Sequence, residues 1–280
     1  MKKASVLFVV LMAVLMVFNL TGCSKLTAEE MIAKANDSVN AASSMDVKMT
    51  IGINMQVNGA DQPIDTVIEA SAFTDPLKVK AITKLGEPTL TTETYAEMEG
   101  DKIIVYAGMA GEWVRQEMSL EEFNADASSN FQQDAQLFLG SMRSFEAAEE
   151  PETLNGVETV KITGKITGDD IKKVMETSGS LDGMDEMAGG DDAFDSLTSD
   201  IYKDMKDIPV TVWLDQKTYA IVRIEMDMTE CIAAIYTTIF GSMGITEDMI
   251  KVNSAVFKMD ISNLNSATEF EIPEAAKNAK

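Results

Sequence analysis

The clearest pattern in the chain is an alternation of apolar and polar residues that begins near Met45. Over residues 45–57 every second residue is apolar, and the residues between are polar or small. Successive side chains of a β-strand point to opposite faces, so this period of two predicts a strand with one buried and one wet face. Turn sequences follow at short intervals, beginning with Asn58-Gly59. Strands of similar character are expected over about 64–73, 77–85, 89–98, 102–107 and 112–117. Their short connections predict an antiparallel meander.

Helical periodicity flanks the meander on both sides. Residues 26–43 carry apolar residues on one helical face, and Thr27 with Glu30 has the spacing of a capping box. Ser119 and Glu122 repeat this spacing at the start of a helical region that runs to about residue 143. Later helices are expected from Thr167, over 194–206 and, broken by glycines, over 230–250; strands are expected around Asn155-Gly156 and over 209–215, 219–228 and 251–261.

The N-terminus has the features of a secretory signal. Lys2 and Lys3 precede an apolar run over residues 6–18, which is shorter than the roughly 20 apolar residues of a membrane span. Leu20-Thr21-Gly22-Cys23 then resembles the bacterial lipobox, whose cysteine carries acyl chains such as palmitate. We therefore expect a cleaved signal peptide at 1–22, a lipidated Cys23 with a short tether at 23–25, and a single domain over 26–280. The alternative is an ordinary secreted protein in which Cys23 is incidental.

The net charge of the chain narrows the range of possible binding partners. Removal of residues 1–22 leaves 21 basic against 46 acidic side chains, a net charge of −25. Such a chain is repelled by nucleic acid and by anionic headgroups, so neither is an expected partner. The expected location is the extracytoplasmic face of the cell membrane, reached through the lipid on Cys23. The sequence indicates no protein partner.

Candidate chemistry is sparse. The chain contains no histidine, which removes the usual catalytic triads and most zinc sites, and it lacks the common nucleotide-binding and nucleophile motifs. A pair of carboxylates could still hydrolyse a glycoside, but with 46 acids such a pair has almost no predictive value. The acidic, glycine-rich stretch 179–193 is interpreted as a loop without a specific metal. Cys231 lies in an apolar stretch and is predicted to be a buried small hydrophobe. No cofactor, metal or catalytic residue is expected.

The order of a helix, a long meander, helical insertions and a returning sheet resembles the LolA-like lipoprotein fold, including LppX/LprG-type lipid carriers. The ending Phe270-Glu271-Ile272-Pro273 is similar to that of uncharacterised bacterial lipoproteins. The resemblance implies an α+β fold in which a strongly curved antiparallel sheet, an open half-barrel, is wrapped around or covered by helices. It carries no catalytic motif, so it transfers no functional residue.

Three functions compete. The favoured hypothesis is a non-enzymatic, lipid-anchored binding protein that holds an apolar ligand, a lipid or a lipoprotein acyl chain, between the curved sheet and the helices. The second is a structural or interaction lipoprotein with a solid core, and the third, least supported, is an acid-pair hydrolase. Many methionines lie on apolar faces, where flexible thioethers fill a core or line an adaptable cavity. The candidate cavity-lining residues are Met49, Ile51, Ile53, Met55, Val212, Leu214, Ile224, Met226 and Met228.

Overall fold

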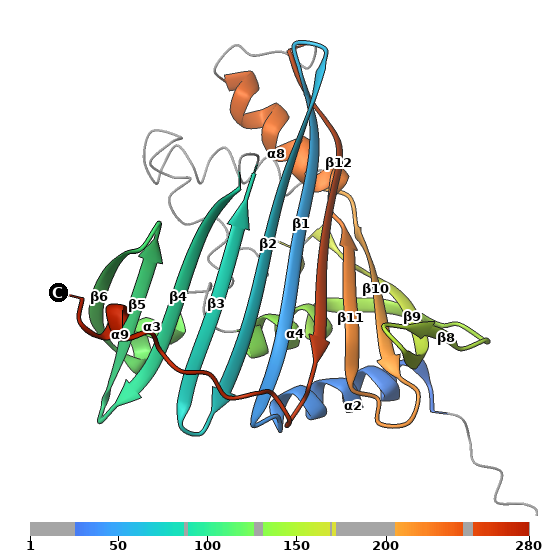
Figure 1. Ribbon diagram of the computed structural model, residues 1–280. Helices are drawn as coiled ribbons and strands as arrows, with labels where there is room; N and C mark the ends of the chain where they lie inside the picture. The colour runs from blue at the N-terminus through green and yellow to red at the C-terminus, as the bar shows by residue number, and fades with distance from the viewer. Residues whose placement is uncertain are drawn as a thin grey trace, which may run out of the picture.

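A computed structural model describes residues 26–86, 89–125, 131–168, 170–171, 205–242 and 249–279 (Figure 1). These residues form a 12-stranded antiparallel sheet with helices packed against it. The strands are β1 (Ser44–Val57), β2 (Ala60–Thr74), β3 (Leu77–Leu85), β4 (Leu90–Glu99), β5 (Lys102–Met109), β6 (Glu112–Ser119), β7 (Met142–Ala147), β8 (Glu152–Leu154), β9 (Val157–Ile166), β10 (Ile208–Asp215), β11 (Ile221–Asp227) and β12 (Ile250–Ser262). The helices are α2 (Ala28–Asn40), α3 (Leu120–Ala125), α4 (Phe131–Ser141), α8 (Thr229–Ser242) and α9 (Glu274–Lys277).

The strand order places β1 beside β12, although the two strands are far apart in the sequence. The sheet runs β6-β5-β4-β3-β2-β1-β12-β11-β10-β9-β7, and β8 pairs with β9. The meander from β1 to β6 therefore forms one half of the sheet, and β12 returns beside β1 to begin the other half. Figure 1 shows the sheet curving without closing on itself. The expected α+β class, with an open curved antiparallel sheet, is confirmed.

Local sequence explains the hairpins of the meander. Asn58 and Gly59 both have positive φ, at 50° and 82°, and they join Val57 to its cross-strand partner Ala60. Two consecutive residues with positive φ give the tight turn whose twist matches a hairpin, and asparagine and glycine tolerate that conformation. The strands expected for residues 45–117 are all present, with ends shifted by a few residues.

One face of the sheet, which we call the inner face, packs against α2, α4 and α8. Met45 and Val47 of β1 lie in the same buried cluster as Ala35 and Val39 of α2. The rings of Phe138 in α4 and Phe257 in β12 lie 5.5 Å apart. Both hydrogen bonds of the α2 capping box are present, since the Glu30 amide donates to Thr27 Oγ1 and the Thr27 amide donates to Glu30.

The region after β6 differs in part from expectation. The capping box of Ser119 and Glu122 is present and opens α3. The helical region expected to about residue 143 is present as α3 and α4, and it ends at Ser141, where the chain enters β7. A positive φ at Ser144 and a register shift after Arg143 interrupt β7, so its alternation is not visible in the sequence. The helix expected over 194–206 lies mostly outside the described residues, as does the loop at 179–193.

The opposite, outer face carries the C-terminal segment. Residues 263–279, which we call the C-terminal strap, run from the end of β12 across β1 to β5 (Figure 1). Ile272 and Ala276 are buried against Tyr95, Ile104 and Tyr106 in a small second core. Gly108 allows the ring of Trp113 to lie close to its backbone at this core, because a Cβ atom there would stand only 2.6 Å from the ring.

Candidate ligand-binding face

The inner faces of β2, β3, β4 and β5 form a continuous surface whose residues follow from the strand register. Cross-strand partners share a face, so Ile68 is followed across the sheet by Thr83, Thr92 and Met109. Twelve residues make up the part of this surface that extends toward the β3–β4 hairpin; none is fully buried, although Ile68, Ala81 and Val105 pack against the edge of the main core. We call this part of the surface the open inner face: Ile64, Thr66, Ile68, Ala81, Thr83, Leu85, Leu90, Thr92, Thr94, Val105, Ala107 and Met109.

Two properties distinguish the open inner face. None of its twelve residues is buried, since each is half-exposed or exposed. None is charged either, whereas all charged residues of the same four strands lie on the outer face. Those outer residues are Asp61, Asp65, Glu69, Lys78, Lys80, Lys84, Glu93, Glu97, Glu99 and Lys102. An uncharged, largely apolar surface of this extent is therefore open to solvent in a strongly acidic chain.

Small side chains occupy one row of this surface. One row across the strands consists of Ala70, Ala81, Thr94 and Ala107, each the direct neighbour of the next. Only Ala70 at the start of the row is buried. Ala81 packs against the main core, and Ala107 at the far end of the row is exposed.

The nine residues predicted to line a cavity divide between two environments. Val212, Leu214 and Ile224 are completely buried, Met226 is 3% exposed, and all four belong to the main core. Met55 is buried beneath α8, and Met228 is half-buried in contact with the same cluster. Met49, Ile51 and Ile53 of β1 are half-exposed and lie opposite Ile68, Thr66 and Ile64, so they border the open inner face.

Ligand contact by these nine residues stays a prediction. The twelve residues of the open inner face were not among them. The signal that could have found these twelve is the absence of charge at every second position in each of four successive strands.

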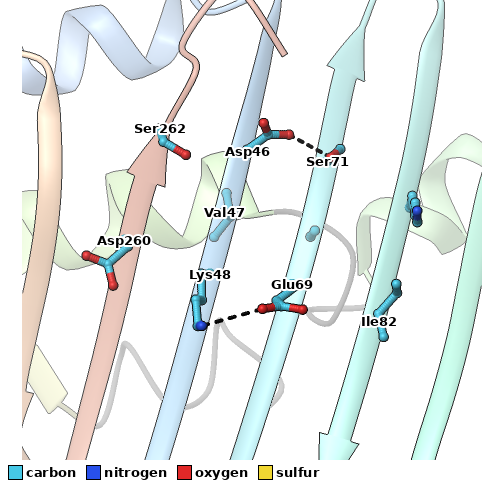
Figure 2. A pocket seen from close by; sticks show the side chains of 10 residues that line it. Asp46, Val47, Lys48, Glu69, Ser71, Ile82, Asp260 and Ser262 are labelled. Carbon is cyan, nitrogen blue, oxygen red and sulfur yellow. Dashed lines mark hydrogen bonds and ion pairs between the residues drawn. The ribbon is translucent and has the colours of Figure 1, made fainter. Parts of the chain in front are cut away.

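The outer face contains a shallow polar depression, shown in Figure 2. It has a volume of about 290 Å³ and is centred on β1 and β2, with lining from β3 and β12. Its charged groups already have partners within the fold: Ser71 Oγ donates to Asp46 at 2.6 Å, and Lys48 pairs with Glu69 at 3.4 Å. Asp260 accepts two hydrogen bonds from Arg223, at 2.8 and 3.0 Å. This arrangement is a network of cross-strand ion pairs that stabilises the sheet.

Glu69 is the centre of one part of that network. Lys84 Nζ lies 3.0 Å from one carboxylate oxygen of Glu69, and Lys48 Nζ lies near the other. The hydrogen bond and charge of Lys84, with those of Lys48, hold the pKa of Glu69 below its ordinary value against the opposing effect of partial burial. Charge complementarity on this face is thus satisfied between neighbouring strands.

The described residues contain little reactive chemistry. Cys231 is buried in the main core, as predicted, and burial raises the pKa of its thiol to about 11. Such a thiol is not a nucleophile near neutral pH. Across the described ranges, no three histidine, cysteine, aspartate or glutamate side chains gather as metal ligands. No helix in those ranges has the length and apolar character needed to cross a bilayer.

Comparison with known protein families identifies the family of this chain. A family model described as "Family of unknown function (DUF6612)" matches residues 27–280. The chain belongs to this family. The match covers every element of the described fold from the start of α2. Among curated proteins, none matches the chain.

Several solved structures resemble the fold of this DUF6612 member. The lipoprotein LppX of Mycobacterium tuberculosis is 17% identical with a TM-score of 0.48, and the match covers 87% of this chain and 98% of LppX. LprF of Mycobacterium bovis is 14% identical with a TM-score of 0.47, covering 89% and 97%. A LolA superfamily protein of Nitrosomonas europaea is 10% identical with a TM-score of 0.23, covering 88% and 96%. These are proteins of the kinds that the sequence resemblance named, and no residue role is carried over from them.

Proposed function

We propose that this protein binds an apolar ligand on the open inner face. The observation that carries the proposal is the segregation of charge described above, which leaves twelve inward residues of four adjacent strands, four of them exposed and eight partly buried, without a charge. Contiguous exposed apolar surface of more than a few hundred Å² is uncommon on soluble proteins and marks a binding surface. A ligand lying there would remove both its own apolar surface and that of the strands from water.

The chemistry of the face favours an uncharged, chain-like ligand such as a lipid acyl chain. Ala81, Thr94 and Ala107 form a shallow row, flanked by larger apolar side chains such as Ile68 and Val105. Threonine presents a methyl group and a hydroxyl, so this surface suits a mostly hydrocarbon ligand with a neutral polar group, such as an ester. A free carboxylate or phosphate finds no cation among these residues.

Ligand binding is tested most directly by placing a large side chain in the row of Ala81, Thr94 and Ala107. Thr94→Trp places a large ring between Ala81 and Ala107, where it should occupy the ligand position and lower the affinity for the neutral dye Nile red about tenfold or more, a change of roughly 1.4 kcal/mol. The matched control is Thr91→Trp, which makes the same change on the outer face of the same strand. Affinity should fall in the first variant and stay unchanged in the second.

Two outcomes would contradict the proposal. One is a wild-type chain that binds no Nile red and releases no lipid on organic extraction. The other is equal binding by the two tryptophan variants. Either outcome would favour the alternative of a structural or interaction lipoprotein. If the wild-type chain instead binds Nile red and releases lipid, mass spectrometry of the extracted molecules would identify the natural ligand class.

We also propose that Cys23 anchors the mature protein to the outside of the cell membrane. Support comes from the charged start, the short apolar run and the Leu20-Thr21-Gly22-Cys23 sequence. Cys23→Ser should release the protein from membranes or leave it unprocessed. A processed Cys23→Ser protein that still fractionates with membranes would contradict the anchor.

A further inference from the structure

Exposed large apolar residues gather at one end of the open inner face. Leu85, Leu90, Met109 and Val114 are 43 to 63% exposed. We call these four residues the tip patch. Leu85 and Leu90 close the β3–β4 hairpin, while Met109 and Val114 lie on either side of the β5–β6 turn. Because β3 and β5 run in the same direction, both hairpin ends lie on the same side of the molecule (Figure 1).

The register makes the tip patch continuous. Leu85 lies directly opposite Leu90. Met109 lies opposite Thr92, one diagonal step from Leu90, and Val114 lies opposite Ala107, one diagonal step from Met109. Diagonal neighbours on one face of a sheet are about 7 to 8 Å apart, within reach of long side chains. All four side chains therefore share the inner face and form one apolar strip across four strands.

The β5–β6 turn beyond the tip patch is short. Ala110 and Gly111, with φ of 52° and 86°, connect Met109 to Glu112 directly. A tight turn leaves the side chains at the strand ends unshielded by a long loop. The tip patch can thus approach a flat surface, which a patch recessed in the middle of a sheet could not do.

We propose that the tip patch docks the protein onto a neutral lipid surface, where ligand enters or leaves the open inner face. This surface is not the membrane that holds Cys23, because α2, which follows the short tether, lies at the opposite end of the sheet (Figure 1). Three of the four patch residues belong to that face, so the docking surface and the binding surface are continuous. The patch contains no charged residue, and the charged residue beside it on the inner face, Glu112 opposite Met109, is acidic, as is the chain as a whole with its net charge of −23. Apolar contact without basic residues fits a zwitterionic bilayer rather than an anionic one. The role in ligand exchange rests on the proposed function; the membrane contact itself does not.

Vesicle binding tests the docking surface. All described elements and the family match lie C-terminal to residue 26, so a chain beginning at residue 24 keeps them and removes the predicted anchor from the measurement. This chain should sediment with phosphatidylcholine vesicles. Leu85→Ser combined with Leu90→Ser should weaken partitioning about tenfold or more, since two exposed leucines lose their burial in the bilayer. Replacing part of the phosphatidylcholine with phosphatidylglycerol should weaken binding at low salt, and added salt should restore it.

The chain offers a matched control at the other end of the sheet. Met98 and Leu120 are 39 and 41% exposed and lie near the β4–β5 turn and the start of α3. Met98→Ser with Leu120→Ser removes similar apolar surface and should leave partitioning unchanged. The fluorescence of Leu90→Trp should also be quenched by brominated lipid more than that of Met98→Trp, after the signal of the native Trp113 and Trp213 is subtracted.

Three results would overturn the inference. The first is a wild-type chain that does not bind phosphatidylcholine vesicles while it still binds Nile red, which leaves the proposed function standing. The second is equal loss of partitioning in the tip-patch and control variants. The third is a wild-type chain that forms a dimer and does not bind vesicles, while the Leu85→Ser/Leu90→Ser variant is a monomer. This result would mean that the patch contacts a second copy of the chain.

Discussion

The two halves of the sheet bury their inner faces very differently. In β10 and β11, Val212, Leu214 and Ile224 are inaccessible to solvent. In β3 and β4, Ala81, Thr83 and Thr94 occupy equivalent inward positions and all remain half-exposed. Both halves alternate with a period of two and pair with the same antiparallel geometry. Strand pattern alone therefore builds the sheet, while the size of the inward side chains and the helices above them decide which half becomes a core.

The difference has a simple physical basis. Large branched side chains on β10, β11 and β12 reach the apolar faces of α2, α4 and α8 and fill the space at the density of a protein interior. In β3 to β5 only Val79, Ala96 and Ile103 of the inner face are buried in the same core, and the smaller alanine and threonine side chains beyond them are partly buried or exposed. We call the half formed by β9 to β12 the closed half and the half formed by β2 to β5 the open half. Stability should reside mainly in the closed half, and ligand contact in the open half.

The largest expected effect comes from shortening one isoleucine in each half. Ile224→Ala in the closed half removes a fully buried side chain and should lower the free energy of unfolding by about 2 to 5 kcal/mol. Ile68→Ala in the open half removes a half-exposed side chain and should cost about 1 kcal/mol or less. Urea denaturation of both variants measures the difference. Equal losses would mean that the open half is packed as tightly as the closed half.

A smaller effect is expected from loosening the C-terminal strap behind the open half. The Phe270 ring lies 6.0 Å from Phe73 and 5.9 Å from Tyr95, and Lys78 Nζ donates to the Phe270 carbonyl at 2.6 Å. Phe270→Ala should cost about 2 kcal/mol through lost burial, with faster amide exchange in β4 and β5. Glu271→Ala, at an exposed neighbouring position, is the control and should change neither. Unchanged exchange in the Phe270 variant would show that the open half needs no support from the strap.

The sequence was most informative where local chemistry decides structure. The alternation over 45–57, the Asn58-Gly59 turn and both capping boxes predicted elements that the structure confirms. Contacts between residues far apart in the sequence were harder to predict from it. The Phe270-to-Pro273 ending suggested a resemblance, but its packing on Tyr95 depends on residues some 175 positions earlier in the chain. The periodicity of a short stretch of sequence gives no information about such a contact.

The candidate site illustrates the same limit. Selecting the strongest apolar strands led to Val212, Leu214 and Ile224, because large hydrophobic side chains are the usual sign of an apolar cavity. Those residues are large enough to complete a core with the helices. The open inner face is instead marked by small and uncharged residues, whose meaning becomes visible only when the register aligns four strands. Sequence patterns predicted which residues share a face of each strand, but not how far the described helices cover that face.

The smallest expected effect concerns the ion pairs on the outer side of the open half. Lys84 and Lys48 lower the pKa of Glu69, so the folded state holds the charged carboxylate more favourably than the unfolded state does. The resulting stabilisation is full above the ordinary carboxyl pKa of 4.5 and is lost as the pH falls through the lowered value of the folded state. Glu69→Gln should therefore cost less than about 1 kcal/mol at pH 7, as is typical of exposed ion pairs, and less still at pH 3. Urea midpoints of the variant and wild type at the two pH values measure this change. A difference that grows on acidification would show that Glu69 is not stabilised by its lysine neighbours, and the outer network would then contribute nothing to holding the strands of the open half together.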